Sequence, residues 1–263
     1  MTAFKAPNVV RTAPYTAPSR GGLFIDALTA NQGYVTVGYV GDKCGYDRLK
    51  FQVRQGRDET YNYDFHPLEK PMRVPMNMGH GHYLFRVMER VEGNEYAQVM
   101  ATERDVKLIS RFVPYTIPTV FCDYDVQGPC VRMARYVTED CATELDALSA
   151  VTKWVAGYVS YDYDKARSLV GKSGYVPSPD RTFRERKGIC FDYASMEAAM
   201  LRSLDIPCKV VTGYVNGGTY HSWVVAYADG KWRRRDPTFT SVLSKAGSKV
   251  SLSTYTYKNR FVY

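Results

Sequence analysis

The sequence lacks several features that would assign it to common classes of protein. No apolar run reaches the roughly 18 residues that a membrane-spanning helix needs, so we expect no membrane span. The opening residues show no basic start followed by an apolar stretch, so we expect no signal peptide in this sequence. There are only 4 histidines and no Cys-X-X-Cys pair, so we expect neither a metal site nor a cofactor.

Basic residues exceed acidic ones without forming the pattern of a nucleic-acid-binding protein. The formal net charge is +8, with 15 basic and 12 acidic residues over 1–111 and 20 and 15 over 112–263. The two dense basic runs, 184–187 and 233–235, are not interleaved with aromatic side chains, so we expect no nucleic-acid partner. Both runs adjoin the motifs described below. Two explanations of these basic runs stay open: a positively charged rim that attracts acidic substrates, and an ordinary solvated surface.

The six cysteines do not decide whether the protein is located in an oxidising or a reducing compartment. They stand at positions 44, 122, 130, 141, 190 and 208. If one is a free nucleophile, five remain, so at most two disulfides can form. Cys122, Cys130 and Cys141 lie close in sequence, and a disulfide among them is expected only if the protein is exported. Cys208 opens an apolar strand, so we expect it to be buried.

The composition and the pattern of apolar residues predict a short flexible amino-terminal segment, or lead, followed by two domains. With 263 residues and 45% apolar content, the chain can bury a large core or two smaller ones. Residues 1–22 are rich in Pro, Thr and Ala and predict a flexible lead, which would suit a chain whose signal has been removed. Residues 23–110 form the first predicted domain, and residues 111–263 form the second. The boundary lies where two prolines interrupt an aromatic stretch and helical periodicity begins after Pro129.

The first domain is predicted to be a β-sandwich. Its short segments alternate apolar and polar residues, and glycine-containing turns separate them at regular spacing. The expected strands are 34–39, 49–54, 59–65, 82–88 and 96–100. Nothing in this domain indicates catalysis.

The second domain contains a predicted helix that follows Cys190. Between Phe191 and Leu204 the apolar residues recur at three- and four-residue steps, and Pro207 closes the helix. Gly188 would let the chain turn sharply into it. Cys190 then lies at the first residues of the helix, where free N–H groups and the helix dipole favour a thiolate. An earlier helix is predicted from apolar spacing over 145–159.

A predicted β-hairpin brings a histidine and an aspartate together. Asp229-Gly230 lies between two runs of aromatic and β-branched residues, which is the strongest local hairpin signal. With these as the two loop residues, Trp223 faces Asp236. His221 and Asp236 are then diagonal neighbours on one face, about 7–8 Å apart at the backbone, and their side chains can hydrogen-bond. A preceding strand from Cys208 and an edge strand in the tail from Ser248 would complete an antiparallel sheet on the helix.

These three residue types suit nucleophilic catalysis. A cysteine attacks as a thiolate, an adjacent imidazole accepts its proton, and a carboxylate on the other ring nitrogen orients the imidazole. Cys190, His221 and Asp236 are therefore the candidate nucleophile, base and orienting acid. A buried cysteine, a strand histidine and an Asp-Pro turn are the ordinary structural explanations, but they leave the shared location unexplained.

The motifs around these residues resemble the bacterial transglutaminase-like superfamily of cysteine proteases. The resemblance covers roughly residues 112–263 and rests on several motifs in fixed order. These are Lys187-Gly-Ile-Cys-Phe-Asp-Tyr-Ala194, Arg202-Ser-Leu-Asp-Ile-Pro207, Val210-Val-Thr-Gly-Tyr214, His221-Ser-Trp223, and Trp232 before Asp236-Pro-Thr238. The resemblance implies an α+β fold with a papain-like or transglutaminase-like core, a helix packed on an antiparallel sheet, after the all-β sandwich. It also implies the same roles for Cys190, His221 and Asp236.

The resemblance further implies an enzyme of protein or peptide substrates, secreted or in the cell envelope. Hydrolysis, as in a protease or amidase, and transfer to an amine, as in a cross-linking transglutaminase, both stay open. A non-catalytic protein that contacts the cell surface or cell wall is the alternative. The family's second oxyanion donor is an upstream side chain, for which Tyr161, Tyr163 and Tyr175 are candidates. Residues 79–83 resemble a strand entry in β domains that accompany this catalytic domain, whose role could be substrate positioning, cell-wall contact or spacing.

Overall fold

The computed structural model describes residues 4–46, 48–56, 59–245, 247 and 252–263. The chain divides into two compact units. Unit 1 contains residues 1–12 and 115–263, and unit 2 contains residues 13–114. Among the described residues, no helix combines the length and the apolar character needed to cross a membrane.

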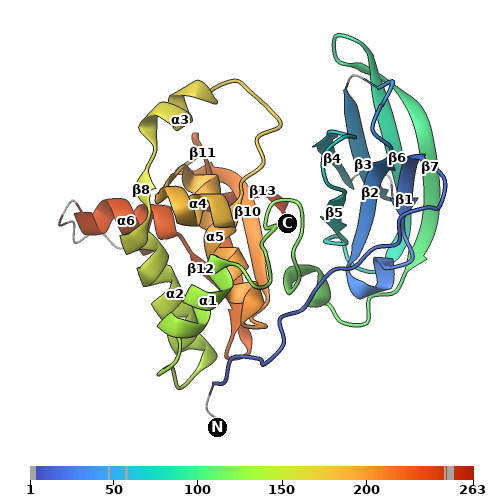
Figure 1. Cartoon of the computed structure of the whole chain (residues 1–263). Helices are drawn as coiled ribbons and strands as arrows, with labels where there is room; N and C mark the ends of the chain where they lie inside the picture. The colour runs from blue at the N-terminus through green and yellow to red at the C-terminus, as the bar shows by residue number, and fades with distance from the viewer. Residues whose placement is uncertain (1–3, 47, 57–58, 246, 248–251) are drawn as a thin grey trace. The chain divides into compact units, whose positions relative to one another are not determined.

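Unit 2 is built from two antiparallel sheets (Figure 1). One sheet has the order β1-β2-β5 and the other has the order β4-β3-β6-β7. The strands are β1 (Gly22–Asp26), β2 (Tyr34–Val40), β3 (Leu49–Gln55), β4 (Glu59–Phe65), β5 (Met72–Pro75), β6 (Gly81–Glu92) and β7 (Glu95–Val106). The five predicted strands correspond to β2, β3, β4, β6 and β7. β1 and β5 were not predicted, because both strands are short and lack a clear alternation.

Alternation along the strands of unit 2 buries one face of the larger sheet. Leu49, Phe51 and Val53 of β3 are buried, while the residues between them are partly exposed. Phe51 stacks on Phe85 of the neighbouring β6, with ring centroids 6.2 Å apart. Aromatic pairs across neighbouring strands add to the stability that apolar burial provides. The all-β character of this region is therefore set by its period-two pattern.

The amino-terminal segment differs from the flexible lead that its composition predicts. The backbone N–H of Phe4 donates to the carbonyl of Ala142 at 2.7 Å. Val10 is buried in the core of unit 1, and Arg11 pairs with Asp205 through two hydrogen bonds of 2.6 and 2.9 Å. Composition predicts chain flexibility only where no partner is available, and here unit 1 supplies both apolar and charged partners.

Unit 1 combines helices with an antiparallel sheet of order β12-β11-β10-β13. This confirms the predicted α+β class. The helices are α1 (Pro129–Val137), α2 (Glu144–Tyr158), α3 (Tyr163–Ser168), α4 (Pro179–Glu185), α5 (Cys190–Ser203) and α6 (Pro237–Lys245). The strands are β8 (Ser160–Tyr161), β9 (Lys187–Gly188), β10 (Cys208–Val215), β11 (Thr219–Ala228), β12 (Lys231–Arg235) and β13 (Tyr257–Val262). The predicted edge strand of the tail is β13, and residues 248–251 of that tail lie outside the described residues.

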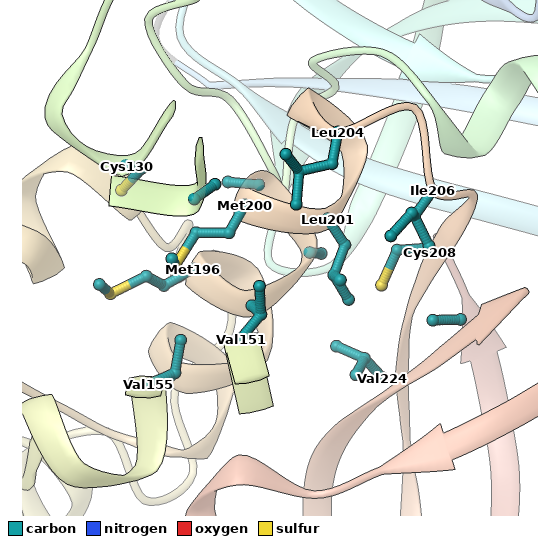
Figure 2. Close-up of a cluster of buried hydrophobic side chains, with 14 of the residues drawn as sticks. Cys130, Val151, Val155, Met196, Met200, Leu201, Leu204, Ile206, Cys208 and Val224 are labelled. Atoms are coloured by element: carbon teal, nitrogen blue, oxygen red, sulfur yellow. The ribbon is translucent and has the colours of Figure 1, made fainter. Parts of the chain in front are cut away.

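Helix α5 is the centre of unit 1. Every residue from Asp192 to Ser203 is buried, because the helix packs on β10 and β11 and is covered by α1, α2, α4 and α6 (Figure 1). Figure 2 shows Met196, Met200 and Leu201 of α5 among side chains from α1, α2 and the sheet. Burial of this size contributes most of the favourable free energy of folding. The start of α5 is therefore held in place by a large core.

The β11–β12 hairpin has the predicted register. Ala228 pairs with Lys231 and Val224 with Arg235, so opposed residue numbers sum to 459, as the two-residue loop requires. The loop residues Asp229 and Gly230 have φ angles of 49° and 78°. Positive φ at both central positions is typical of the type I′ turn that closes right-twisted hairpins.

A buried arginine joins the end of α5 to distant segments of unit 1. Arg202 is 1% exposed, and its guanidinium donates to the carbonyls of Cys208, Ile117 and Tyr263 and to the hydroxyl of Thr119 at 2.8 to 3.1 Å. The guanidinium thus joins the end of α5 to three other parts of unit 1.

We predict that Arg202→Met destabilises the protein by at least about 3 kcal/mol, because it removes four hydrogen bonds that a buried guanidinium donates. The measurement is urea unfolding followed by tryptophan fluorescence, since Trp154, Trp223 and Trp232 all lie in unit 1. The matched control is Arg184→Met at an exposed position of α4, which should change stability by less than about 0.5 kcal/mol. Equal midpoints for the two variants would contradict this role for Arg202.

Candidate active site

Cys190 is the first residue of α5, as the sequence predicts. Asp192 stabilises this helix start, because its carboxylate accepts a hydrogen bond of 2.8 Å from the backbone N–H of Ile189. Gly188 is required for a reason other than the predicted sharp turn. A Cβ atom at Gly188 would lie 2.6 Å from the Cβ of Asp192, so only glycine leaves space for the buried carboxylate. Cys190 itself is partly exposed, at the end of the helix where the dipole favours an anion.

His221 and Asp236 form a buried hydrogen-bonded pair. The Nε2 atom of His221 lies 2.8 Å from Oδ2 of Asp236, and the two residues are 4% and 1% exposed. The hairpin register delivers this contact, as expected for diagonal neighbours on one face. The ring of Phe239 stacks on the imidazole with centroids 4.5 Å apart. The imidazole is thus held by a carboxylate at one edge and an aromatic ring on its face.

Asp236 receives two further hydrogen bonds. The backbone N–H of Phe239 donates to Oδ1 at 3.0 Å, and the hydroxyl of Tyr257 donates to Oδ2 at 2.9 Å. Burial, together with the neighbouring Asp236 carboxylate, raises the pKa of Tyr257, so its hydroxyl keeps its proton. These two donors hold the carboxylate in position beside His221.

The surroundings of His221 favour its charged form. Burial lowers the pKa of His221, but hydrogen bonds and charge interactions with Asp236 and Cys190 outweigh burial and raise the pKa to about 10. The same interactions connect the imidazole both to Cys190 and to Asp236. All three residues predicted from the sequence therefore meet at one place.

Three residues that position this site were not predicted from the sequence: Asp192, Lys165 and Tyr257. Asp192 accepts from Lys165 Nζ at 2.7 Å and from the Tyr175 hydroxyl at 2.5 Å, so it ties α3 and the following loop to the start of α5. Tyr257 contacts Asp236 from β13, which is distant in sequence. Lys165 and Tyr257 form no motif with their partners, and only the Cys190–Asp192 spacing offers a local signal.

The three tyrosines considered as oxyanion donors have different surroundings. The hydroxyl of Tyr175 is bound to Asp192, and Tyr163 is 61% exposed. Tyr161 pairs with Gly188 between β8 and β9, and is half-buried. Burial raises the pKa of Tyr161 to about 12, and interaction with Cys190 adds to this rise. Tyr161 is thus the candidate that interacts with the predicted nucleophile.

The six cysteines are all free, so the disulfide considered among Cys122, Cys130 and Cys141 does not form. Cys208 is buried as predicted, and so are Cys122 and Cys130. Burial raises the pKa of the Cys122 thiol to about 11 and that of Cys208 well above its usual value. Burial therefore makes these two thiols poor nucleophiles, in contrast to the accessible cysteine at the helix start.

Comparisons with known proteins were consistent with the motifs. The family model of the transglutaminase-like superfamily matches residues 131–237. The human kyphoscoliosis peptidase is 26% identical over 136 residues, which is 48% of this chain and 19% of that protein. The mouse protein of the same name gives the same identity and coverage. This chain therefore spans about one fifth of the length of these relatives.

Solved structures were also compared with the chain. A candidate cysteine protease from Cytophaga hutchinsonii is 15% identical, with 88% of this chain and 91% of that chain covered and a TM-score of 0.42. Red sea bream transglutaminase is 12% identical, with 88% and 49% covered and a TM-score of 0.35. Residues 131–237, which include Cys190, His221 and Asp236, are therefore similar to the transglutaminase-like superfamily.

Proposed function

We propose that this protein is a thiol enzyme that transfers the acyl group of a protein or peptide carboxamide or peptide bond. One observation carries the proposal: the buried His221–Asp236 pair interacts with Cys190 at the start of α5. The transglutaminase-like domain at 131–237 supports an enzyme of this class. Cys190 is the nucleophile, His221 the acid and base, and Asp236 the orienting carboxylate.

The proposed reaction proceeds through a thioester. His221 holds the proton from Cys190, and the Cys190 sulfur attacks the carbonyl carbon of the substrate. The carbonyl oxygen becomes an oxyanion, for which the Cys190 N–H and the Tyr161 hydroxyl are the proposed donors. His221 then gives its proton to the leaving ammonia or amine, and the carbon–nitrogen bond breaks. Attack by water or by a second amine, which loses a proton to His221, releases the acyl group and restores the thiol.

Protease or amidase activity and cross-linking differ only in the acceptor of the acyl group. Water gives hydrolysis, and a lysine amine gives a cross-link. Among the proteins similar to this chain, one is named as a peptidase and another as a transglutaminase. Secretion or cell-envelope location, bacterial origin and cell-wall contact through unit 2 remain predictions from the sequence resemblance.

A non-catalytic interaction protein is the competing function. Such a protein would need the fold, but it would not need a protonated His221. The raised pKa of His221, which depends on both Asp236 and Cys190, favours the enzyme. Structural ion-pair networks also shift pKa values, so the two functions require a direct test.

The test is incubation with a glutamine-containing peptide, with and without a primary amine, followed by mass spectrometry. We expect conversion of the glutamine to glutamate, addition of the amine with loss of ammonia, or cleavage of the chain, and each product identifies one acceptor or bond. Cys190→Ala should abolish the product, whereas Cys141→Ala, at a partly exposed cysteine outside the site, should retain it. Unchanged peptide under all conditions would favour the interaction protein.

We also predict that Tyr257→Phe lowers kcat about 5- to 10-fold with little change in KM, because it removes one hydrogen bond to Asp236 but no contact to substrate. The measurement is steady-state kinetics over a range of pH. Tyr255→Phe is the matched control, since the Tyr255 ring packs on Phe239 with centroids 4.8 Å apart. A kcat for Tyr257→Phe equal to that of the control would show that this hydroxyl does not position the acid.

A further inference from the structure

Helix α5 carries a second buried acid that the proposed reaction does not use. Glu197 lies about two turns after Cys190 and has no exposed surface. Its Oε2 atom has no hydrogen-bond partner among the residues that the structure describes. A buried ionised carboxylate with an unsatisfied oxygen is costly, so the neutral acid is the favoured form in such surroundings.

The hydroxyl of Thr152 lies between Glu197 and a backbone carbonyl. Its oxygen is 2.8 Å from the carbonyl oxygen of Leu148 and 2.6 Å from Oε1 of Glu197. A hydroxyl has one hydrogen to donate, so it can donate to only one of these two oxygens at a time. A protonated Glu197 would satisfy both contacts, because Oε1 would then donate to Thr152 and Thr152 to Leu148.

The charges around Glu197 come mainly from the end of β12. Arg235 is half-buried and favours ionisation of Glu197, whereas Asp236 opposes it. Cys208 on β10 also interacts with Glu197, and α2 contributes the uncharged hydroxyl of Thr152. Burial is the dominant effect: it outweighs the hydrogen bond with Thr152, which lowers the pKa of Glu197, and raises that pKa to about 8.

We propose that Glu197 is held as a neutral acid and acts as a positioning residue for Asp236, whose orientation is lost when Glu197 ionises. A neutral Glu197 fastens α5 to α2 through Thr152 and adds no negative charge beside Asp236. An ionised Glu197 would repel Asp236 and draw Arg235 toward the core. The hydrogen bond between Asp236 and His221 would then be weakened, although none of the residues assigned to the reaction is replaced.

The direct test is carbon NMR of the full chain with glutamate labelled at the side-chain carboxyl. We expect one glutamate resonance to titrate near pH 8, well above the exposed glutamates. This experiment needs neither substrate nor variant, so it decides the protonation state even if the proposed function fails. Titration of all glutamate resonances in the ordinary acidic range would overturn the proposal.

Stability gives a second readout with a definite sign. Below about pH 4.5 the folded and unfolded chains both hold the Glu197 proton. Between about 4.5 and about 8 only the folded chain holds it, so the free energy of unfolding falls as pH rises, and above 8 the loss is complete. Glu197→Gln should remove this part of the pH dependence, and Glu139→Gln, at an exposed site on unit 1, should keep it.

The positioning role rests on the proposed function and is tested by the pH profile of kcat/KM. In the parent, activity should fall as Glu197 ionises, and in Glu197→Gln this alkaline fall should move to higher pH. If Glu197 had only a structural role, kcat/KM would fall at the same alkaline pH in the variant and in the parent. That result would overturn the positioning role. If Glu197→Gln does not fold, Thr152→Val provides the readout, because loss of the hydroxyl should shift the titrating glutamate resonance.

Discussion

The hydrogen bond between His221 and Asp236 is the interaction on which the site depends. Both side chains are almost fully buried, so water cannot replace the partner that each provides for the other. The pair exists because a two-residue turn at Asp229-Gly230 sets the β11–β12 register. A shift of one residue would place the two side chains on opposite faces of the hairpin. The chemistry proposed for this protein therefore begins with the geometry of a turn.

The second constraint is that α5 forms both the core of unit 1 and one wall of the site. The helix contacts four helices and three strands, and its first residue is Cys190. Asp192 at the helix start and Arg202 near its end are buried polar groups that join it to other segments. The packing of α5 in the core therefore fixes the position of the Cys190 sulfur. Substitutions in this helix should affect stability and reactivity together.

Much of this arrangement could be predicted from the sequence because the signals are local. Helical spacing identifies α5, and the Asp-Gly turn gives the register that joins His221 to Asp236. Contacts between distant segments carry no comparable signal. Tyr257 reaches Asp236 from β13, Lys165 reaches Asp192 from α3, and Thr152 reaches Glu197 from α2, and each depends on tertiary packing. The amino-terminal segment was misjudged for the same reason, since its partners are in unit 1.

The central proposal is that the His221–Asp236 pair activates Cys190 as a nucleophile. The most direct measurement is the rate of Cys190 alkylation by iodoacetamide as a function of pH, read by peptide mass spectrometry beside the buried Cys208. The account predicts rapid labelling of Cys190 at neutral pH, and a rate in His221→Ala that recovers only in alkaline solution. Labelling of Cys190 no faster than that of Cys208, or an unchanged profile in His221→Ala, would contradict it.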